Sequence, residues 1–227
     1  MNNKFTYAIG LMSGTSLDGL DIVYVKFTKN DLSQFKILSA ETINYTESWK
    51  KRLQNAINFN DDEIQILNKE YGVFLGEKTK EFIRLNEISD LDFIASHGHT
   101  IFHQPAKGIT LQIGDGQEIS NAIHCKVVCD FRTQDVLFGG QGAPLAPIFH
   151  QLLVNQNRIK LPVCILNIGG IANITIISSK NFNDLTKQVE PSLIEWRRHF
   201  HEFPELSNRE FNTGKYIADY LKSIGLE

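Results

Sequence analysis

The spacing of apolar positions changes along the chain from the two-residue period of strands to the longer period of helices. Near the N-terminus, apolar runs separated by turn residues predict three strands of a meander: Tyr7–Met12, Asp21–Phe27 and Lys36–Asn44. Helical spacing follows over Glu47–Ile57 and Asp61–Leu85, and Asn60 precedes the second of these helices as an N-cap residue. The chain therefore opens with a small sheet followed by a long helix.

The remainder of the pattern alternates short apolar runs with turn residues. A helix is predicted over Leu145–Val154, after a cluster of glycines. Further strands are predicted at Phe93–Ala95, Thr110–Ile113, Lys126–Cys129, Val163–Asn167 and Asn173–Ile177. Strands that alternate with helices after an opening meander predict an α/β fold with a mixed sheet.

Polar clusters follow several of these strands. They lie at Ser13–Asp18, Ser96–His103, Asp130–Asp135 and Asn167–Gly170. Because α/β proteins bind ligands at the ends of their strands, each cluster is a candidate part of a functional site.

The first cluster belongs to the most informative stretch of the chain, Gly10–Asp21, which reads Gly-Leu-Met-Ser-Gly-Thr-Ser-Leu-Asp-Gly-Leu-Asp. A turn between two strands can direct the backbone N–H groups of Gly14, Thr15 and Ser16 at one anion, since glycine adds no Cβ. The hydroxyl groups of Ser13, Thr15 and Ser16 would add donors. This turn is therefore a candidate phosphate site, and an empty β-hairpin is the alternative.

The acidic residue in this turn, Asp18, would repel a bare phosphate. Its carboxylate is suited to holding a metal ion and the waters of that ion. The turn is not a Walker A motif, because that motif needs a lysine and none occurs between Lys4 and Lys26.

Three histidines follow the Phe93–Ala95 strand, with the spacing His97-x-His99-x3-His103. Hydrogen bonding to a polar substrate is the first interpretation of this cluster. A loop of solvated histidines is the second interpretation, and a metal site is the third, since zinc sites usually add a carboxylate or thiolate ligand.

Asp130-Phe-Arg132 and Asp135 follow the Lys126–Cys129 strand. A carboxylate beside a guanidinium stays ionised and could act as a general base on water or on a sugar hydroxyl, although a surface ion pair is the alternative. The glycines of Gly139–Gly142 would let the backbone approach a ligand closely. A second Gly-Gly turn, Asn167–Gly170, could meet phosphate in the same way as the first.

The composition of the chain limits the classes of function. Its 227 residues carry a net charge of −3, so no basic surface indicates a nucleic-acid partner. Three cysteines, Cys125, Cys129 and Cys164, favour free thiols in a reducing cytosol, the first two as buried strand residues. Neither a signal peptide nor the roughly 20 apolar residues of a membrane span is predicted.

Together, six ordered motifs resemble the anhydro-N-acetylmuramic acid kinase family over residues 5–179. They are Gly10–Asp21, Ser96–Thr100, Gln112–Gly114, Asp130–Arg132 with Asp135, Gly139–Leu145 and Leu166–Gly170. The resemblance implies an actin/hexokinase-like ATPase fold with two α/β lobes. It also implies a cytoplasmic enzyme of peptidoglycan recycling, which uses ATP and water to convert 1,6-anhydro-N-acetylmuramic acid to N-acetylmuramic acid 6-phosphate.

The resemblance also implies roles for single residues. Asp135 matches the catalytic aspartate that activates water, and His97, Arg132, Gln141 and Gly142 match the substrate side. Mg²⁺ is expected at Asp18. The ATP-binding residues are expected to be Gly14, Thr15, Ser16, Leu17, Asp18, Gly19, Leu20, Asp21, Asn167, Gly169 and Gly170.

Beyond about residue 180 the kinase pattern is lost. We expect residues 1–180 to form the N-terminal lobe of the kinase, residues 181–191 to be a junction, and residues 192–227 to form a helical segment. The segment over residues 189–227 resembles the first helices of metal-dependent amidohydrolases, the hippurate hydrolase and aminoacylase group, but it ends before the His-x-Asp metal-binding segment of that group.

The absent second-lobe motifs predict an incomplete second lobe, and therefore a truncated kinase with little or no turnover by this chain alone. They also predict self-association, for example as a homodimer, because part of the surface facing the cleft would be exposed. Two other functions stay open: a remnant that binds a sugar or phosphate without turnover, and a fragment of an amidohydrolase fusion.

Overall fold

The computed structural model describes residues 4–143, 145–168, 172–177, 215 and 219. The chain divides into two compact units, residues 1–156 and residues 157–227, and each is described by itself. The predicted junction at 181–191 and nearly all of the predicted helical segment at 192–227 lie outside the described residues.

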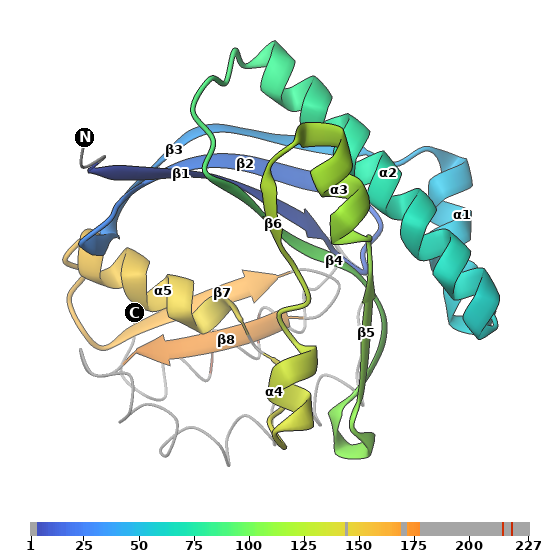
Figure 1. The fold of residues 1–227 in the computed structure, drawn as a ribbon. Helices are drawn as coiled ribbons and strands as arrows, with labels where there is room; N and C mark the ends of the chain where they lie inside the picture. The colour runs from blue at the N-terminus through green and yellow to red at the C-terminus, as the bar shows by residue number, and fades with distance from the viewer. Residues whose placement is uncertain (1–3, 144, 169–171, 178–214, 216–218, 220–227) are drawn as a thin grey trace. The chain divides into compact units, whose positions relative to one another are not determined.

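A mixed sheet forms the centre of the first unit (Figure 1). The strands β1 (Phe5–Ser13), β2 (Gly19–Thr28) and β3 (Asp31–Asn44) form the predicted antiparallel meander. The strand β4 (Phe93–Gln104) pairs in parallel with β1. Its far edge pairs with β6 (Lys126–Val128), in parallel, and with β5 (Ile109–Ile113), antiparallel.

The predicted α/β class is confirmed by this arrangement. The spatial order β3-β2-β1-β4, with β6 beyond β4, gives a mixed sheet that helices flank. This arrangement is consistent with the lobe of an actin/hexokinase-like ATPase that the motifs imply.

The helices of the first unit cover the two faces of the sheet. The helix α1 (Glu47–Asn55) continues into a short 3₁₀ turn (Ala56–Asn58), and α2 (Asp61–Leu85) follows. The other helical elements are a 3₁₀ turn at Pro105–Lys107, α3 (Gly116–Ile123), α4 (Thr133–Leu137) and α5 (Ala146–Gln156).

The long helix α2 begins and ends where the sequence predicts. The Asn60 side chain accepts from the backbone N–H of Glu63, whose own side chain accepts from the Asn60 N–H, so a capping box begins the helix. One apolar stripe of α2 is buried against the sheet. Its buried side chains recur every three or four residues and so share one face of the helix; they include Ile64, Leu67, Tyr71, Leu75, Thr79 and Phe82.

The helices α2 and α3 lie side by side in Figure 1, and two glycines of α2 allow their close approach. A Cβ on Gly72 would lie 2.6 Å from the Asp115 carbonyl oxygen, and one on Gly76 would lie 2.8 Å from the Ala122 Cβ. The Asn68 side-chain oxygen accepts from the Gly114 N–H. Together these contacts place the residues that follow β5 against the middle of α2.

Some local predictions are wrong. The strand β4 was expected to end at Ala95, but it continues to Gln104, so the Ser96–His103 cluster lies within a strand and not after one. The helices α3 and α4 were not predicted. Cys125 and Cys129 are not buried strand residues, because they flank β6, the first half-buried and the second exposed. All three cysteines are free thiols.

In the second unit, the described residues include an antiparallel pair of strands, β7 (Val163–Ile168) and β8 (Ala172–Ile177). Both strands lie where the alternation of apolar residues predicts them. Among the helices of the described residues, none is long and apolar enough to span a membrane.

Candidate active site

The predicted phosphate turn joins β1 to β2. The Leu17 N–H donates to the Gly14 carbonyl oxygen (3.3 Å), and Leu17 has a positive φ of 59°. The side chains of Thr15, Ser16 and Asp18 are exposed. Two hydroxyl groups and one carboxylate on an exposed turn are a donor and ligand set that suits phosphate together with a hydrated cation.

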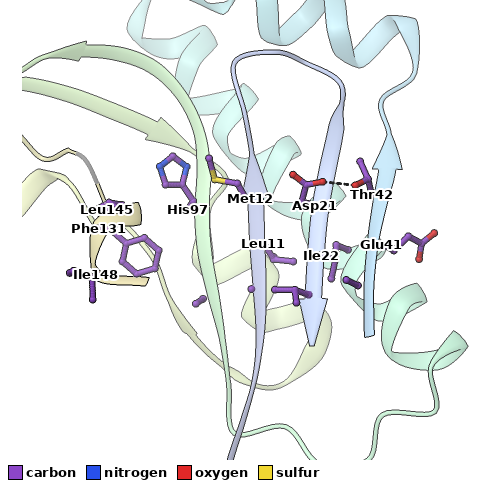
Figure 2. Close-up of a pocket in the computed structure, with 14 residues that line it drawn as sticks. Leu11, Met12, Asp21, Ile22, Glu41, Thr42, His97, Phe131, Leu145 and Ile148 are labelled. Atoms are coloured by element: carbon purple, nitrogen blue, oxygen red, sulfur yellow. Dashed lines mark hydrogen bonds between the residues drawn. The ribbon is translucent and has the colours of Figure 1, made fainter. Parts of the chain in front are cut away.

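Three of the predicted ATP-binding residues lie in β2 beyond this turn. A Cβ on Gly19 would lie 2.5 Å from the Ile43 carbonyl oxygen, so this glycine is required by the pairing of β2 with β3. The Leu20 side chain is fully buried in the core. The Asp21 carboxylate accepts from the Thr42 hydroxyl (2.6 Å; Figure 2). The exposed polar groups of this motif are therefore those of residues 14–18, together with the Asp21 carboxylate, which is also exposed.

Ser13 has a different role from the predicted one. Its hydroxyl was expected to add a donor for the anion, but the side chain is only 3% exposed. It accepts from the Tyr45 hydroxyl (2.7 Å) and lies 2.9 Å from His99 Nδ1. The hydroxyl therefore points into the protein and away from the exposed turn.

A bulge in β4 separates the environments of His97 and His99. The register of β4 against β1 shifts after Ser96, and Gly98 adopts a φ of 70°. A Cβ on Gly98 would overlap with the carbonyl oxygen of Ile113, so only glycine fits here. In a regular strand, residues two positions apart share a face. Here His99 is buried beside Tyr71 of α2, while His97 lines a cavity at the other face.

His97 is held by Arg132. The guanidinium donates to His97 Nε2 from Nε (3.1 Å) and approaches the same nitrogen with Nη2 (2.8 Å). Because arginine has only donors, His97 Nε2 is unprotonated, and Nδ1 carries the proton and donates to the Gly98 carbonyl oxygen (3.0 Å). Burial, together with the positive charge of Arg132, lowers the pKa of His97, which keeps the imidazole neutral.

The same arginine reaches the glycine-rich segment after α4. Arg132 Nη1 donates to the Gly142 carbonyl oxygen (2.6 Å), and the Gly142 N–H donates to Asp135 Oδ2 (2.6 Å). One peptide segment therefore connects the guanidinium to the carboxylate. Arg132 and Asp135, predicted as neighbours, are therefore joined through the backbone of Gly142. Asp130, the other carboxylate of this cluster, accepts from the Thr133 N–H.

Glycines shape the surroundings of the Asp135 carboxylate. A Cβ on Gly140 would overlap with this carboxylate, and the Gly140 N–H donates to the Asp135 carbonyl oxygen (2.8 Å). Gly142 has a φ of 61° and no room for a Cβ beside Val136. Asp135 and Gln141 are exposed, so the segment holds a solvent-accessible carboxylate in a defined orientation.

The three predicted histidines do not converge. His97 contacts Arg132, His99 contacts Ser13, and His103 Nδ1 lies 3.1 Å from the Thr110 hydroxyl. Within the described part of the chain, no group of three or more His, Cys, Asp or Glu side chains could hold a metal ion. The histidine metal site, the third interpretation of this spacing, is therefore wrong.

A cavity of about 920 Å³ opens at the sheet face that carries His97 (Figure 2). Apolar side chains from β1, β2 and the segment 131–148 line most of it, among them Met12, Phe131 and Ile148. His97 lies on one side, and Asp21 with Glu41 on the other. The cavity is mostly apolar with a few polar groups at its border, as ligand sites commonly are.

The strand β4 supports both the Arg132 cluster (His97, Arg132, Asp135 and Gly142) and the start of the phosphate turn. His97 holds Arg132, and His99, two residues later, holds Ser13 at the start of the turn. Two residues of a strand span about 7 Å. The predicted second phosphate segment belongs to the other unit: Asn167 lies in β7, and Gly169 and Gly170 lie outside the described residues.

Comparison with known proteins gives a consistent family. The model of the family described as anhydro-N-acetylmuramic acid kinase matches residues 6–183. Proteins of that name are similar in sequence. The one from Pelagibacter ubique is 40% identical over 226 residues, which cover 93% of this chain and 60% of the relative. The one from Zymomonas mobilis is 40% identical over 192 residues, covering 78% and 51%.

A third relative, from Rhodopseudomonas palustris, has the same name and is 36% identical over 185 residues, which cover 75% of this chain and 49% of the relative. The chain thus spans about half to three fifths of the length of these curated relatives.

Proposed function

Since the chain belongs to the anhydro-N-acetylmuramic acid kinase family, we propose that it takes part in the ATP-dependent conversion of 1,6-anhydro-N-acetylmuramic acid to N-acetylmuramic acid 6-phosphate. The observation that supports this most directly is the Asp135 carboxylate, exposed and oriented by the Gly142 N–H beside Arg132. The reaction needs a base for water and a site for phosphate, and the first unit holds a candidate for each.

Asp135 is the proposed general base. Its carboxylate takes a proton from the water that attacks the anomeric carbon, the bond from that carbon to O6 breaks, and O6 is left to accept a phosphoryl group. The Gly142 N–H holds Oδ2, so the direction of the carboxylate is set before substrate binds. Asp130, which caps the same short segment through the Thr133 N–H, has no such role in this proposal.

On the phosphate side, the proposed contacts are the backbone and hydroxyl groups of Gly14, Thr15 and Ser16, with Asp18 holding the waters of Mg²⁺. ATP supplies the phosphoryl group, and Mg²⁺ offsets the charge of its phosphates. The exposure of these three side chains, Thr15, Ser16 and Asp18, supports their assignment. In the first unit, Leu17, Gly19 and Asp21 complete the proposed ATP contacts, whereas the Leu20 side chain is fully buried and takes no part in them. Asn167, Gly169 and Gly170 are proposed as further ATP contacts from the family resemblance alone.

On the sugar side, the proposed contacts are Arg132, Gln141 and Gly142, with His97 behind them. Both ring nitrogens of His97 already have protein partners, so His97 acts in this proposal mainly by orienting Arg132. The partner is a small amino sugar, and neither nucleic acid nor a membrane is part of the proposal. A cytoplasmic location and self-association as a homodimer belong to the same proposal.

Sugar binding and phosphorylation test this function separately. Calorimetry with 1,6-anhydro-N-acetylmuramic acid is expected to give binding that Arg132→Ala weakens. With ATP and Mg²⁺, product formation is expected to fall by at least about 100-fold in Asp135→Asn. Asp130→Asn removes the same charge five residues away and is expected to keep the wild-type rate. Equal losses in both variants would overturn the assignment of Asp135.

The predicted low turnover of this chain alone is measured in the same assay. Sugar binding without any product in the wild type would favour the non-catalytic remnant. A rate equal to that of a kinase of the relatives' full length would contradict the prediction of weak turnover.

The amidohydrolase-like resemblance of residues 189–227 stays a hypothesis about that segment. The family model ends at residue 183, near the predicted junction. The Pelagibacter ubique relative covers 93% of the chain, a share that residues 1–191 alone do not reach, so its alignment continues into the predicted helical segment. Mass spectrometry of the protein from its source cell tests the junction. A native peptide spanning residues 181–197 would show that the kinase-like part and the segment after it are joined in one natural chain.

A further inference from the structure

Four buried side chains form a line of hydrogen bonds that passes through the residue directly before the phosphate turn. The hydroxyls of Tyr71 and Tyr45 lie 2.6 Å apart, the Tyr45 hydroxyl donates to Ser13 Oγ (2.7 Å), and Ser13 Oγ lies 2.9 Å from His99 Nδ1. None of the four residues is more than 4% exposed. Ser13 is the last residue of β1, directly before Gly14.

The proton of Tyr45 goes to Ser13, so the proton between the two tyrosines comes from Tyr71. In the tautomer of His99 that carries its proton on Nε2, Nδ1 accepts from the Ser13 hydroxyl. Burial lowers the pKa of His99 to about 4, so the imidazole is neutral and able to accept near pH 7. Burial also raises the pKa of both tyrosines, so both remain donors.

These side chains come from four different segments. Ser13 ends β1, Tyr45 lies between β3 and α1, Tyr71 lies in the middle of α2, and His99 follows the bulge of β4. A buried hydroxyl without a partner is costly, so each group constrains the position of the next. Most buried side chains of this core are apolar, and apolar side chains could fill the same space. The hydrogen bonds therefore fix the directions of these side chains, which packing alone would not do. At Ser13 they also fix the end of β1 from which the turn begins.

We propose that the hydrogen-bonded line Tyr71–Tyr45–Ser13–His99 is a positioning device that holds the Gly14–Asp18 turn in its phosphate-binding conformation. This inference rests on the proposed function, because it assigns the four residues to the phosphate side of that reaction. Ser13, Tyr45 and His99 are positioning residues, since they act through the turn and touch no substrate. Tyr71 supports them from the far end of the line.

Amide hydrogen exchange, measured without any ligand, tests the proposal. Ser13→Ala is expected to speed exchange in a peptide covering residues 12–19 by about tenfold, as the loss of a buried hydrogen bond would. Tyr45→Phe is expected to act in the same direction but less strongly. Tyr71→Phe removes the hydroxyl at the far end of the line and is expected to act in the same direction, but least strongly of the three.

The matched control is Tyr24→Phe. It removes only the hydroxyl of a buried tyrosine, which donates to the Asp90 carbonyl oxygen (2.6 Å) away from the turn. This variant is expected to leave exchange in the turn at the wild-type rate. Exchange in the turn that is the same in Ser13→Ala as in Tyr24→Phe would overturn the proposal, as would equal acceleration across α3.

Kinetics distinguish failure of this inference from failure of the proposed function. Where phosphoryl transfer is measured, Ser13→Ala is expected to raise KM for MgATP about tenfold and leave KM for the anhydro sugar unchanged. An effect on the sugar alone would overturn the positioning role. A wild-type chain that neither binds the sugar nor transfers phosphate would count against the proposed function, while exchange in the turn would still decide the role of Ser13.

Discussion

Two histidines separated by one glycine in β4 occupy opposite kinds of environment. His97 lies at the cavity face, where its partner Arg132 connects it to the exposed Asp135 carboxylate through Gly142. His99 lies in the core and closes a line of buried hydroxyls. Both imidazoles are neutral, and burial is the main cause in each case. The difference lies in what each histidine holds. His97 holds a cluster that is open to ligand, whereas His99 holds Ser13 at the start of the phosphate turn.

The comparison teaches that one short stretch of strand supports both halves of the candidate site. Because Gly98 has a positive φ and the strand bulges there, the side chains of His97 and His99 point to different faces of the sheet. The open cluster has exposed groups that a substrate can reach, whereas the buried line has none. Substitutions should therefore affect function on the His97 side and local order or stability on the His99 side.

The largest effect is expected for Gly98→Ala, which breaks both regions at once. A Cβ at this position overlaps with the Ile113 carbonyl oxygen, and the backbone has a φ of 70°. The free energy of unfolding is expected to fall by about 3 kcal/mol or more, measured by urea denaturation. Gly108→Ala is the control, since Gly108 has a φ of 69° but no atom within 4 Å of the added Cβ, and about 1 kcal/mol is expected there.

Gly140→Ala should separate function from stability on the His97 side. The added Cβ displaces the Asp135 carboxylate, and a shift of about 1 Å in a catalytic group can reduce the rate about 100-fold. Product formation and urea denaturation measure the two quantities. Gly139→Ala is the control, because Gly139 has a φ of 87°, which is unfavourable for alanine, but no atom within 4 Å of the added Cβ. A larger loss of activity in that control would show that the carboxylate contact is unimportant.

The pH dependence of stability should come from the His99 side. The pKa of His99 is about 4 in the folded protein and about 6.5 when unfolded, so the unfolded state binds the extra proton between these values. This contribution is fully present above pH 6.5 and is lost as the pH falls toward 4. Between pH 7 and 5, the loss is about 2 kcal/mol.

His99→Gln keeps an acceptor for Ser13 but does not titrate. The urea midpoint of this variant should therefore change less between pH 7 and 5 than that of the wild type. An identical change in both proteins would show that another group causes the pH dependence.

The smallest effect is expected for Arg132→Gln on the titration of His97. Burial is the main reason that the pKa of His97 is lowered, and the positive charge of Arg132 adds to it. Removing that charge should raise the pKa of His97 and change the pKa of His99 much less, because the charge of His97 is only the smaller cause of the lowered pKa of His99. NMR titration of the two imidazoles measures both, and equal shifts would show that the Arg132 charge acts on both regions alike.

The sequence predicts those parts of the fold that local patterns determine. The meander and the bounds of α2 follow from apolar spacing and from the Asn60 cap. The helix α3 had a signal that was not used, since Asp115 accepts from the N–H groups of Gln117 and Glu118. The helix α4, which carries Asp135, has only five residues and is too short for periodicity to reveal.

What the sequence could not supply depends on distant contacts. Ser-His-Gly-His-Thr has the composition of a loop, but pairing with β1 and β5 makes it a strand. The inward direction of the Ser13 hydroxyl depends on Tyr45 and His99, which are 32 and 86 residues away. The turn residues were candidates from the residue pattern itself, and the family motifs singled out Asp135 as the candidate base, whereas the supports of both became visible only in three dimensions.

The central place of β4 has a consequence for how the chain is made. Its partner β1 is complete by residue 13, but β4 begins only at Phe93. A nascent chain can form the local β1–β3 hairpins early, yet one edge of β1 stays without its partner until about eighty residues have followed. An open strand edge invites pairing with other chains, so the interval before β4 emerges from the ribosome is when this protein is most exposed to misassembly.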